Sequence, residues 1–363
     1  MSADFATTTL PGAPLAPYTT LGLGGPADDL VIVHDEQALI GAVRDADDEG
    51  TPVLILGGGS NVVLADEGFA GRVVLVRTSG VELESAGEGV VVTVAAGEEW
   101  DDVVRRTVER ELAGLECLSG IPGRTGGAPI QNVGAYGQEV ADTCIDVRVW
   151  DRQHGCVLVL PAGDCDFAYR TSVFKQHPGR FVVLSVRFGL RSSELSAPIR
   201  YAQLGEALDV PLGEPAPLSL VRDTVLSLRR SKGMVLDPDD PDSRSVGSFF
   251  LNPVLEAADF DALAARLGRT PPHWPADNGH VKVSAAWLVE AGGFRRGYGD
   301  GPVGISGKHS LALIHRGGGR TSDLLALADE IVGGVQRVTG VHLHPEARII
   351  PDHVEFGRPS AEK

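Results

Sequence analysis

Val53-Leu54-Ile55-Leu56-Gly57-Gly58-Gly59-Ser60-Asn61 is the stretch that decides the fold of this chain. Its four apolar residues predict a buried strand, and the glycines that follow predict a tight turn at the carboxyl end of that strand. Upstream, residues 31–33 predict a short strand, and residues 36–48 predict a helix with Leu39 and Val43 on one side. Together the three segments form a βαβ unit, and a ligand is expected at the carboxyl end of its second strand.

The rest of the chain predicts an α+β arrangement whose character changes near the middle. Apolar runs predict strands at 73–76, 90–94, 145–150, 156–160 and 182–188, interrupted by an amphipathic helix over 100–112. A polar segment with serine and proline, residues 191–217, indicates a boundary. Beyond it, helices are predicted over 218–228, 260–267, 284–290 and 321–338, and a last strand over 347–350. The second half is therefore expected to form a separate α/β domain.

The composition is that of a globular protein, and it excludes several classes. A length of 363 residues favours two or three domains over a single core. The formal net charge of −17, from 32 basic and 49 acidic residues, lacks the basic footprint of a nucleic-acid-binding protein. The four cysteines, at 117, 144, 156 and 165, show no C-x-x-C spacing, which favours a reducing compartment. Because the N-terminus lacks a signal-peptide pattern and no apolar run is long enough to span a membrane, we expect a cytoplasmic protein.

A second glycine-rich segment, Ser119 to Gly137, is too dense in glycine for an ordinary surface loop. Glycine adopts positive φ without cost and has no Cβ, so backbone N–H groups can converge on an anion. The segment matches neither the P-loop pattern nor a strand-linked G-x-G-x-x-G, which argues against a P-loop kinase and a Rossmann dehydrogenase. Two interpretations remain: a set of tight turns, or a pyrophosphate cradle completed by the turn at 57–61.

The stretch Gly247-Ser248-Phe249-Phe250-Leu251-Asn252-Pro253 places one hydroxyl between a glycine and two aromatic side chains. No histidine lies beside Ser248, so the sequence provides no adjacent base that would make it a nucleophile. A serine in a dry pocket is better suited to donate a proton or a hydrogen bond to charge that develops during a reaction. The alternative is a turn with a purely structural role.

Taken in order along the chain, the motifs resemble those of the UDP-N-acetylenolpyruvoylglucosamine reductase family, flavoenzymes of bacterial peptidoglycan precursor synthesis. Matching runs lie at 20–25 (Thr-Leu-Gly-Leu-Gly-Gly), 57–61, 120–123, 132–137 (Asn-Val-Gly-Ala-Tyr-Gly), 167–175 (Phe-Ala-Tyr-Arg-Thr-Ser-Val-Phe-Lys), 229–232 (Arg-Arg-Ser-Lys), 247–253 and 343–348 (Leu-His-Pro-Glu-Ala-Arg). Each run alone is weak evidence, but all of them in order are specific. The resemblance implies a role in cell wall biogenesis, and through it in cell shape, the cell cycle and cell division.

The resemblance implies a two-subdomain FAD-binding fold of the vanillyl-alcohol-oxidase type plus a C-terminal α/β substrate-binding domain. We expect a disordered segment over 1–17, FAD-binding subdomains over 18–80 and 81–217, a UDP-sugar substrate domain over 218–342, and a return strand to the FAD-binding region over 343–357. FAD is expected to bind non-covalently beside the two glycine segments. The implied FAD-binding residues are Gly57, Gly58, Gly59, Ser60, Asn61, Gly120, Ile121, Pro122, Gly123, Gly126, Asn132, Gly134, Ala135 and Tyr136.

By the same resemblance, the reaction is the NADPH-dependent reduction of UDP-N-acetylglucosamine enolpyruvate to UDP-N-acetylmuramate. NADPH reduces FAD, and hydride then passes from flavin N5 to the vinyl carbon C3. The resemblance implies that Ser248 gives a proton to C2, while Arg170 and Glu346 support the negative charge on C2 and its carboxylate. A guanidinium group is always charged and can hold a carboxylate with two bonds, which suits the role implied for Arg170.

The resemblance also implies substrate contacts, and for each the alternative is a solvated surface side chain. Tyr201 matches a tyrosine on a loop that covers the UDP-sugar in one subgroup of the family, so its presence favours that subgroup. The other positions match residues that contact the substrate, including its diphosphate or uridine: Tyr169, Lys232, Asn252 and Lys282. Two positions depart from the family pattern, because His344 stands where an acidic residue is usual and Leu251 where a basic residue is common.

Three further interpretations compete with this one. His342, His344 and Glu346 alternate, so on an extended strand they would share one face and could bind a divalent metal. Pro345 and the lack of an H-E-x-x-H helix argue against this, and we expect no metal. An oxidase of the same flavin fold often tethers FAD through His or Cys, and neither glycine segment contains one. A catalytically silent nucleotide-binding protein is disfavoured by the intact catalytic set. We expect a monomer without nucleic-acid or membrane partners.

Overall fold

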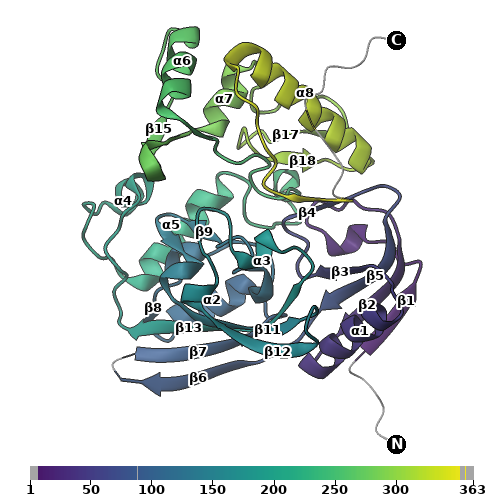
Figure 1. The fold of residues 1–363 in the computed structure, drawn as a ribbon. Helices are drawn as coiled ribbons and strands as arrows, with labels where there is room; N and C mark the ends of the chain where they lie inside the picture. The colour runs from purple at the N-terminus through teal and green to yellow at the C-terminus, as the bar shows by residue number, and fades with distance from the viewer. Residues whose placement is uncertain (1–6, 88, 352–355, 357–363) are drawn as a thin grey trace, which may run out of the picture. The chain divides into compact units, whose positions relative to one another are not determined.

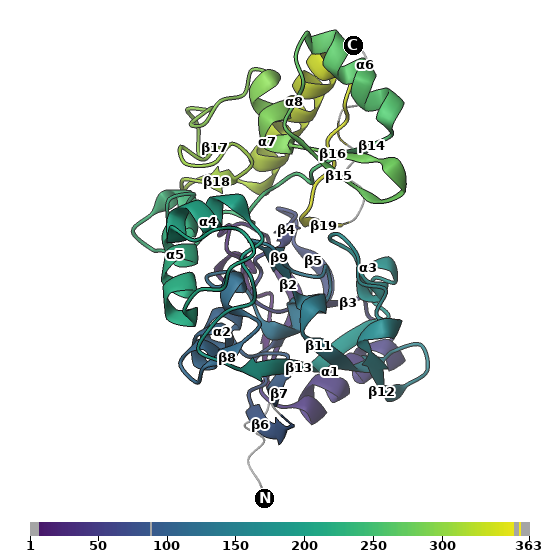
Figure 2. The ribbon, with the colours of Figure 1, turned by 90° about the vertical axis from the view of Figure 1, so that its left-hand side faces the viewer.

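The computed structural model describes residues 7–87, 89–351 and 356, and the chain divides into two compact units. Unit 1 comprises the described residues within 1–13, 27–58 and 70–230, and unit 2 those within 14–26, 59–69 and 231–363. Figure 1 shows the ribbon coloured along the chain, and Figure 2 shows it turned by 90°. Parts of the first 70 residues thus belong to the same unit as the C-terminal segments.

The first sheet of unit 1 contains the predicted βαβ elements. Its strands follow the order β1 (Thr7–Pro11), β2 (Ala27–Val33), β5 (Phe69–Val76) and β3 (Val53–Leu56), with β3 parallel to β5. Helix α1 (Glu36–Asp48) lies over 36–48 as predicted, because Leu39, Val43 and Ala46 are buried and Asp35 accepts the N–H of Ala38 at 2.7 Å.

The N-terminal segment differs from the disorder expected over 1–17. Residues 1–6 lie outside the described residues, but residues 7–11 form strand β1. This strand pairs antiparallel with β2 from Thr7 opposite Val33 to Pro11 opposite Asp29. Since β1 buries none of its side chains, backbone pairing rather than packing orders it.

The second sheet of unit 1 is antiparallel and contains four of the eight predicted strands, those over 90–94, 145–150, 156–160 and 182–188. Its strands follow the order β12 (Cys156–Pro161), β11 (Cys144–Asp151), β13 (Phe181–Ser192), β7 (Gly89–Ala95) and β6 (Val81–Ala86), and the short β8 (Leu112–Ala113) also pairs with β13. Helices α2 (Trp100–Val108) and α3 (Val173–Gln176) belong to the same unit. Trp100 packs edge-to-face on Phe188 of β13 in the core, with ring centroids 5.8 Å apart.

Helix α2 ends four residues before the predicted end at Leu112. Its last residue is Val108, and Glu111 then adopts a φ of 57°, which an α-helix does not allow. Leu112 and Ala113 instead pair with Ser192 and Arg191 as strand β8. The prediction, which rested on apolar spacing alone, extended the helix into residues that pair with the end of β13.

Unit 1 extends to Arg230 instead of ending at the expected boundary, residue 217. Helices α4 (Ala202–Leu208) and α5 (Leu218–Arg230) share a buried cluster with Cys117 that includes Leu204, Val221 and Val225. The apolar face of α5 was predicted correctly, but its partner is the glycine-loop region of unit 1.

Unit 2 contains the three longer helices predicted for the second half: α6 (Ala257–Leu267), α7 (Ala285–Ala291) and α8 (Thr321–Thr339). Its strands are β14 (Val254–Leu255), β16 (Val281–Val283) and β15 (His273–Pro275) in one sheet, β17 (Val303–Ile305) with β18 (Leu313–His315), and β4 (Val62–Leu64) parallel to β19 (Arg348–Ile350). The last pair places the predicted C-terminal strand beside the residues that directly follow the first glycine turn. The end of the expected return strand, 352–355 and 357, lies outside the described residues.

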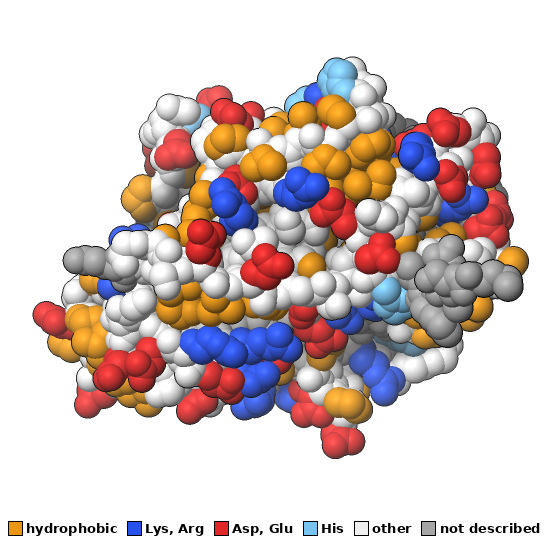
Figure 3. Space-filling view, turned by 90° about the horizontal axis from the view of Figure 1, so that it is seen from below, with side chains coloured by type: hydrophobic (Ala, Val, Ile, Leu, Met, Phe, Trp, Pro, Cys, Tyr) orange, Lys and Arg blue, Asp and Glu red, His pale blue; other side chains and the backbone are white. Residues whose placement is uncertain are grey.

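Short elements complete the description. The glycine loop includes a hairpin of β9 (Gly134–Ala135) and β10 (Gln138–Glu139). Turns of 3₁₀ helix lie at Ala16–Tyr18, Glu116–Leu118, Thr125–Gly127, Val140–Asp142, Ala162–Asp164, Pro241–Ser243 and Asp277–Gly279. The face in Figure 3 shows basic side chains with acidic ones close beside them. No helix of the described residues combines the length and the apolar character needed to cross a membrane.

Candidate active site

The glycine turn after β3 belongs in part to each unit, and in each the backbone is tightly packed. In unit 1, a Cβ on Gly58 would stand 2.6 Å from the Cα of Gly123. In unit 2, a Cβ on Gly59 would stand 2.1 Å from the carbonyl oxygen of Tyr18, and the φ of Gly59 is 62°. A side chain at either position would displace backbone, so both positions require glycine.

The first half of the 119–137 loop is held by the residues that precede and start α2. The N–H of Trp100 donates to the Gly123 carbonyl at 3.1 Å, and the N–H of Gly126 donates to the Ala96 carbonyl at 2.8 Å. A Cβ on Gly126 would stand 2.7 Å from the Cβ of Ala96. The carboxylate of Asp101 accepts the N–H of Gly120 at 2.6 Å. The loop is therefore fixed by bonds to a buried helix start.

Other N–H groups at this place are open to a ligand. Within residues 7–87, 89–351 and 356, the backbone N–H groups of Gly58, Ile121 and Gly123 donate to no protein acceptor. These three residues are half-buried, and a Cβ on Gly127 would meet nothing within 4 Å. Half-buried N–H groups beside close-packed glycines are suited to an anionic group such as a pyrophosphate. The residues present therefore fit the pyrophosphate of a dinucleotide cofactor such as FAD.

Asn132 shapes the second half of the loop from within. Its φ is 45° and it is 1% exposed. The side-chain oxygen accepts the N–H of Ala141 at 2.9 Å, and the side-chain nitrogen donates to Glu139 at 2.7 Å. These bonds link Asn132 to the end of the β9–β10 hairpin and to Ala141 just after it, so the side chain of this predicted cofactor residue stabilises the loop.

Tyr136 and Tyr201, predicted on separate grounds for cofactor and substrate, lie together in unit 1. Their rings pack edge-to-face with centroids 5.4 Å apart. Tyr136 has a φ of 51°, and burial raises the pKa of its hydroxyl while the charge of nearby Arg229 opposes that rise. Tyr201 is 43% exposed at the start of α4. The aromatic pair thus joins the end of the glycine loop to the segment expected to cover substrate.

Arg170 lies on a different segment, between the 3₁₀ turn at Ala162–Asp164 and α3, and its side chain contacts the glycine loop. Its Nη2 donates to the carbonyl of Gly134 at 2.8 Å, and its guanidinium stands 5.5 Å from the ring centroid of Tyr169. Lys175 donates to the Arg170 carbonyl at 2.9 Å. The φ of Arg170 is 53°, an uncommon conformation for a side chain of this size, which surrounding bonds must hold in place. The guanidinium group is therefore held at the loop edge.

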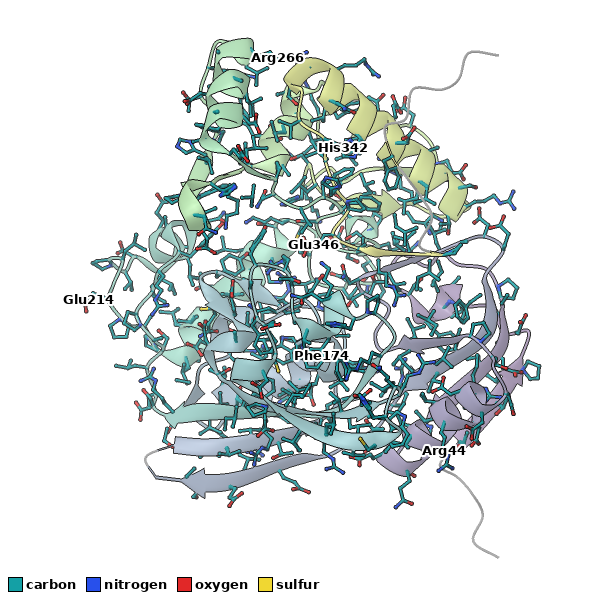
Figure 4. All side chains as sticks on the ribbon, in the orientation of Figure 1. Arg44, Phe174, Glu214, Arg266, His342 and Glu346 are labelled. Carbon is teal, nitrogen blue, oxygen red and sulfur yellow. The ribbon has the colours of Figure 1, made fainter. Side chains whose placement is uncertain are left out.

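In unit 2, the stretches that carry Ser248 and Glu346 run side by side. The N–H of Glu346 donates to the Phe249 carbonyl at 2.7 Å, and the N–H of Leu251 donates to the His344 carbonyl at 3.0 Å. Phe249 and Phe250 are 0% and 1% exposed, so the predicted burial of both aromatics is confirmed. Figure 4 labels Glu346 and His342 on the C-terminal segment that leads into β19. Folding thus brings together two of the three predicted catalytic residues within one unit.

The predicted substrate residues of unit 2 lie on its short sheet and helix ends. The side-chain oxygen of Asn252 accepts the N–H of Ala285 at 2.9 Å, at the start of α7. Lys282 lies on β16 between Val254 and Trp274 of the neighbouring strands. Lys232 lies just after α5, where its charge helps to lower the pKa of His309. Lys282 and Asn252 therefore belong to one corner of unit 2.

Sequence reasoning missed two polar contacts that hold the glycine loop. Glu116 is 1% exposed and accepts bonds from the Gly114 N–H at 2.7 Å and the Gln138 side chain at 3.0 Å. Gln138 in turn accepts the N–H of Cys117 at 2.9 Å. Since Glu116 precedes the loop and Gln138 follows it, the bond between them closes it. The available signal was a charged residue inside the apolar run 115–118, which indicates a buried, paired carboxylate. The second contact is the ion pair between Asp101 and Arg222, and nothing in the sequence around either residue indicated it.

The alternative of a metal site at the C-terminal histidines gains no support from the described part of the chain. Within it, no group of three or more His, Cys, Asp or Glu side chains is arranged to hold a metal ion. The rings of His342 and His344 pack with centroids 4.8 Å apart. Burial lowers the pKa of His344, and His342 contributes in the same direction.

Two family models match the chain. One, described as FAD binding domain, matches residues 27–160, which supports the expected FAD-binding domain of the vanillyl-alcohol-oxidase type. The other, described as UDP-N-acetylenolpyruvoylglucosamine reductase, C-terminal domain, matches residues 239–350. The two matches fall mainly in units 1 and 2 respectively. The expected fold class, α+β with an FAD-binding part and a C-terminal domain, is confirmed.

Relatives match over nearly the whole chain. The UDP-N-acetylenolpyruvoylglucosamine reductase of Thermobifida fusca is 55% identical over 93% of this chain and 96% of its own length. That of Streptomyces coelicolor is 53% identical over 91% of this chain and 87% of its own length. Among solved structures, the UDP-N-acetylenolpyruvylglucosamine reductase of Thermus caldophilus is 25% identical, with a TM-score of 0.63, and the match covers 95% of this chain and 99% of that chain.

Proposed function

The chain belongs to the UDP-N-acetylenolpyruvoylglucosamine reductase family, and we propose that Ser248, Arg170 and Glu346 carry its reaction. It is an FAD-dependent oxidoreductase that uses NADPH in the synthesis of the peptidoglycan precursor. The observation that carries the proposal is the pairing of the Ser248 and Glu346 stretches in unit 2, which places a hydroxyl and a carboxylate on adjacent backbone beside two buried rings. A half-buried hydroxyl on a stretch that pairs with one carrying a carboxyl group is suited to moving one proton.

The protein's part in the reaction is orientation, electrostatics and one proton. Bound FAD would supply the redox chemistry, the transfer of hydride from NADPH to the enolpyruvyl group. The N–H groups of Gly58, Ile121 and Gly123 would hold its pyrophosphate. Ser248 donates its hydroxyl proton to C2, where negative charge develops, and it later regains a proton. Donors and cations that stabilise such charge are typically worth about 3 kcal/mol each. Arg170 fills that role through its guanidinium group, and Glu346 fills it as a protonated carboxylic acid, because an ionised carboxylate would repel the charge on C2.

The remaining predicted residues complete the proposal. The FAD site extends over Gly57, Gly59, Ser60, Asn61, Gly120, Pro122, Gly126, Asn132, Gly134, Ala135 and Tyr136. UDP-N-acetylglucosamine enolpyruvate is held by Tyr169, Tyr201, Lys232, Asn252 and Lys282. For the substrate residues of unit 1, support comes from the contact between Tyr201 and Tyr136. For those of unit 2, it comes from Asn252 and Lys282, which both lie at the short sheet of β14, β16 and β15. We propose that the protein works as a monomer in the cytoplasm.

Replacing Ser248 by Ala tests the proposal by separating the two half-reactions. Reduction of the flavin by NADPH should stay close to the wild-type rate, because that step needs no proton from the hydroxyl. Oxidation of the reduced flavin by the enolpyruvyl UDP-sugar should slow by at least about a hundredfold, the lower range for losing a general acid. Stopped-flow absorbance follows both steps. Ser85→Ala, an exposed serine on β6, serves as the matched control. Equal rates of both half-reactions in Ser248→Ala and wild type would refute the proton-donor role.

A further inference from the structure

Asp101 and Arg222 form an ion pair behind the start of the glycine loop. Asp101 lies in the first turn of α2, and Arg222 lies on α5. Arg222 donates from Nη1 to Oδ1 at 2.7 Å and from Nη2 to Oδ2 at 2.9 Å, so the pair is bidentate. Arg222 is 9% exposed, and the same Oδ1 accepts the N–H of Gly120 at 2.6 Å. Besides the apolar packing of α5 on the loop region, the Asp101 carboxylate thus links Arg222 of this helix to the Gly120 N–H.

The bond to Gly120 sets the direction in which the loop starts. The φ of Gly120 is 71°, so no regular element continues through this residue. Its N–H is used by Asp101, whereas the N–H groups of Ile121 and Gly123, which follow directly, donate to no acceptor among the described residues. Holding Gly120 therefore holds the peptide groups whose N–H donors are available to a ligand.

The charges of the side chains behind the glycine loop affect how strongly the loop would bind an anion. A carboxylate behind an anion-binding loop opposes binding unless a cation compensates it. Burial disfavours the charged form of Asp101, but the bonds from Arg222 and Gly120 and the charges of Arg222 and Arg229 outweigh it, so the pKa of Asp101 lies below its ordinary value. The bonded guanidinium group of Arg222 and the nearby charge of Arg229 thus compensate the charge of the Asp101 carboxylate behind the loop.

We propose that Asp101 and Arg222 are a positioning pair for FAD, which fixes the Gly120 peptide and neutralises the charge behind the pyrophosphate loop. Both act through Gly120 without touching the cofactor. The inference rests on the proposed place of the pyrophosphate at this loop. It adds two residues, from α2 and α5, to the determinants of cofactor affinity.

FAD titration of the flavin-free full-length protein, followed by flavin fluorescence, tests the pair. Arg222→Ala should raise the Kd for FAD by about tenfold or more, because the carboxylate loses its bonded cation and its charge is then only partly compensated, by Arg229. Asp101→Asn should raise it by only about threefold, because an amide oxygen can still accept the Gly120 N–H. The double variant should bind FAD more tightly than Arg222→Ala, since the uncompensated charge is gone. A double variant that binds FAD more weakly than either single variant would contradict the electrostatic part of the inference.

The Asp47–Arg152 pair provides a matched control in the same unit. Arg152 also donates two bonds to an aspartate, but the pair lies on α1 and beyond β11 rather than at the loop. Arg152→Ala should lower thermal stability and leave the Kd for FAD within about twofold of wild type. The inference is overturned if Arg222→Ala leaves the Kd within about twofold of wild type, or if Arg152→Ala weakens FAD binding equally.

Two further measurements distinguish a failure of this inference from a variant that does not fold and from a failure of the proposed function. If Arg222→Ala does not fold, Arg222→Lys retains the charge but loses the bidentate geometry, and the Kd should rise by about threefold; an unchanged Kd would contradict the inference. A wild-type protein that takes up no FAD would instead contradict the cofactor assignment on which the proposed function depends.

Discussion

At the scale of single residues, His309 has a charge state that its sequence context does not reveal. It follows Lys308, yet its ring is turned into unit 2, where Nδ1 accepts the N–H of Leu311 at 3.0 Å. The neutral ring therefore carries its proton on Nε2. Burial lowers the pKa of His309 to about 4, and the charges of Lys232 and Arg296 push it in the same direction. At neutral pH the ring is thus uncharged beside a predicted substrate-binding lysine.

The low pKa of His309 predicts that the protein loses stability in mild acid. Between pH 6.5 and about 4 the unfolded chain binds a proton at this histidine that the folded protein does not, so the free energy of unfolding falls as the pH is lowered. The contribution reaches up to about 3 kcal/mol near pH 4. In urea unfolding at pH 7, 5.5 and 4.5, His309→Asn, which retains an acceptor near Nδ1, should lose stability less steeply than wild type. His34→Asn, at an exposed histidine, should follow wild type. Parallel curves for wild type and His309→Asn would contradict this account.

At the scale of elements, the sequence predicted the bounds of periodic segments well. For the glycine turns it predicted close packing but not the contacts that each turn makes. Helix α1 begins and ends where its apolar spacing and the Asp35 cap indicate. The glycines at 57–61 and 119–137 predicted close backbone approach, but not which peptide meets which. The structure pairs Gly58 with Gly123 and Gly126 with Ala96. Such contacts depend on where two distant turns lie in space, which local spacing does not encode.

Gly58→Ala should weaken FAD binding because its Cβ would stand 2.6 Å from the Cα of Gly123, so one of the two turns must move. Displacing the N–H groups of the loop should raise the Kd for FAD by at least about tenfold, the loss of roughly one charge-assisted bond. The Kd is measured by fluorescence titration. Gly41→Ala in α1, where a Cβ meets nothing within 4 Å, is the matched control and should be neutral or stabilising by up to about 1 kcal/mol. An unchanged Kd for Gly58→Ala would remove this turn from the cofactor site.

At the scale of the whole molecule, residues near the N-terminus complete the C-terminal unit. The sequence predicted that α8 begins at Thr321, and it does. The acceptor for its first N–H groups, however, is Asp66, which bonds Thr321 N–H at 2.7 Å and Ser322 N–H at 3.0 Å. The Thr321 hydroxyl donates to the Leu64 carbonyl at 2.7 Å. The segment 59–69 is thus tied to a helix more than two hundred residues later.

Asp66→Ala should destabilise unit 2 by about 1 kcal/mol, the usual effect of losing a helix N-cap acceptor. Asp66→Asn keeps an acceptor oxygen and should lose less. Because the bonds from Ser322 and Thr321 outweigh burial and lower the pKa of Asp66, the difference between wild type and Asp66→Ala should narrow as the pH falls below about 4. Urea unfolding at pH 7 and pH 3 measures both effects. A loss that is the same for Ala and Asn would show that the acceptor oxygen is not what stabilises α8.

The candidate site divides in the same way between sequence and structure. Arg170, Ser248 and Glu346 were proposed from the sequence by residue type and motif order, because the family relationship is readable in the motifs taken together. Asp101, Arg222 and Glu116 were not, because each acts through a partner distant in sequence. The boundary of unit 1 at Arg230 was not predicted either, because it depends on the packing of α5 against the glycine-loop region.

By itself, the order of residues determined the α+β class, most helices and strands, the family, and the side chains proposed for the chemistry, because periodicity, glycine and motif spacing are local properties. Only the tertiary structure decided which peptides approach each other, which carboxylates hold the loop, that β4 pairs with β19, and that His309 is neutral. These features depend on burial and on contacts between distant segments, and those exist only once the chain has folded.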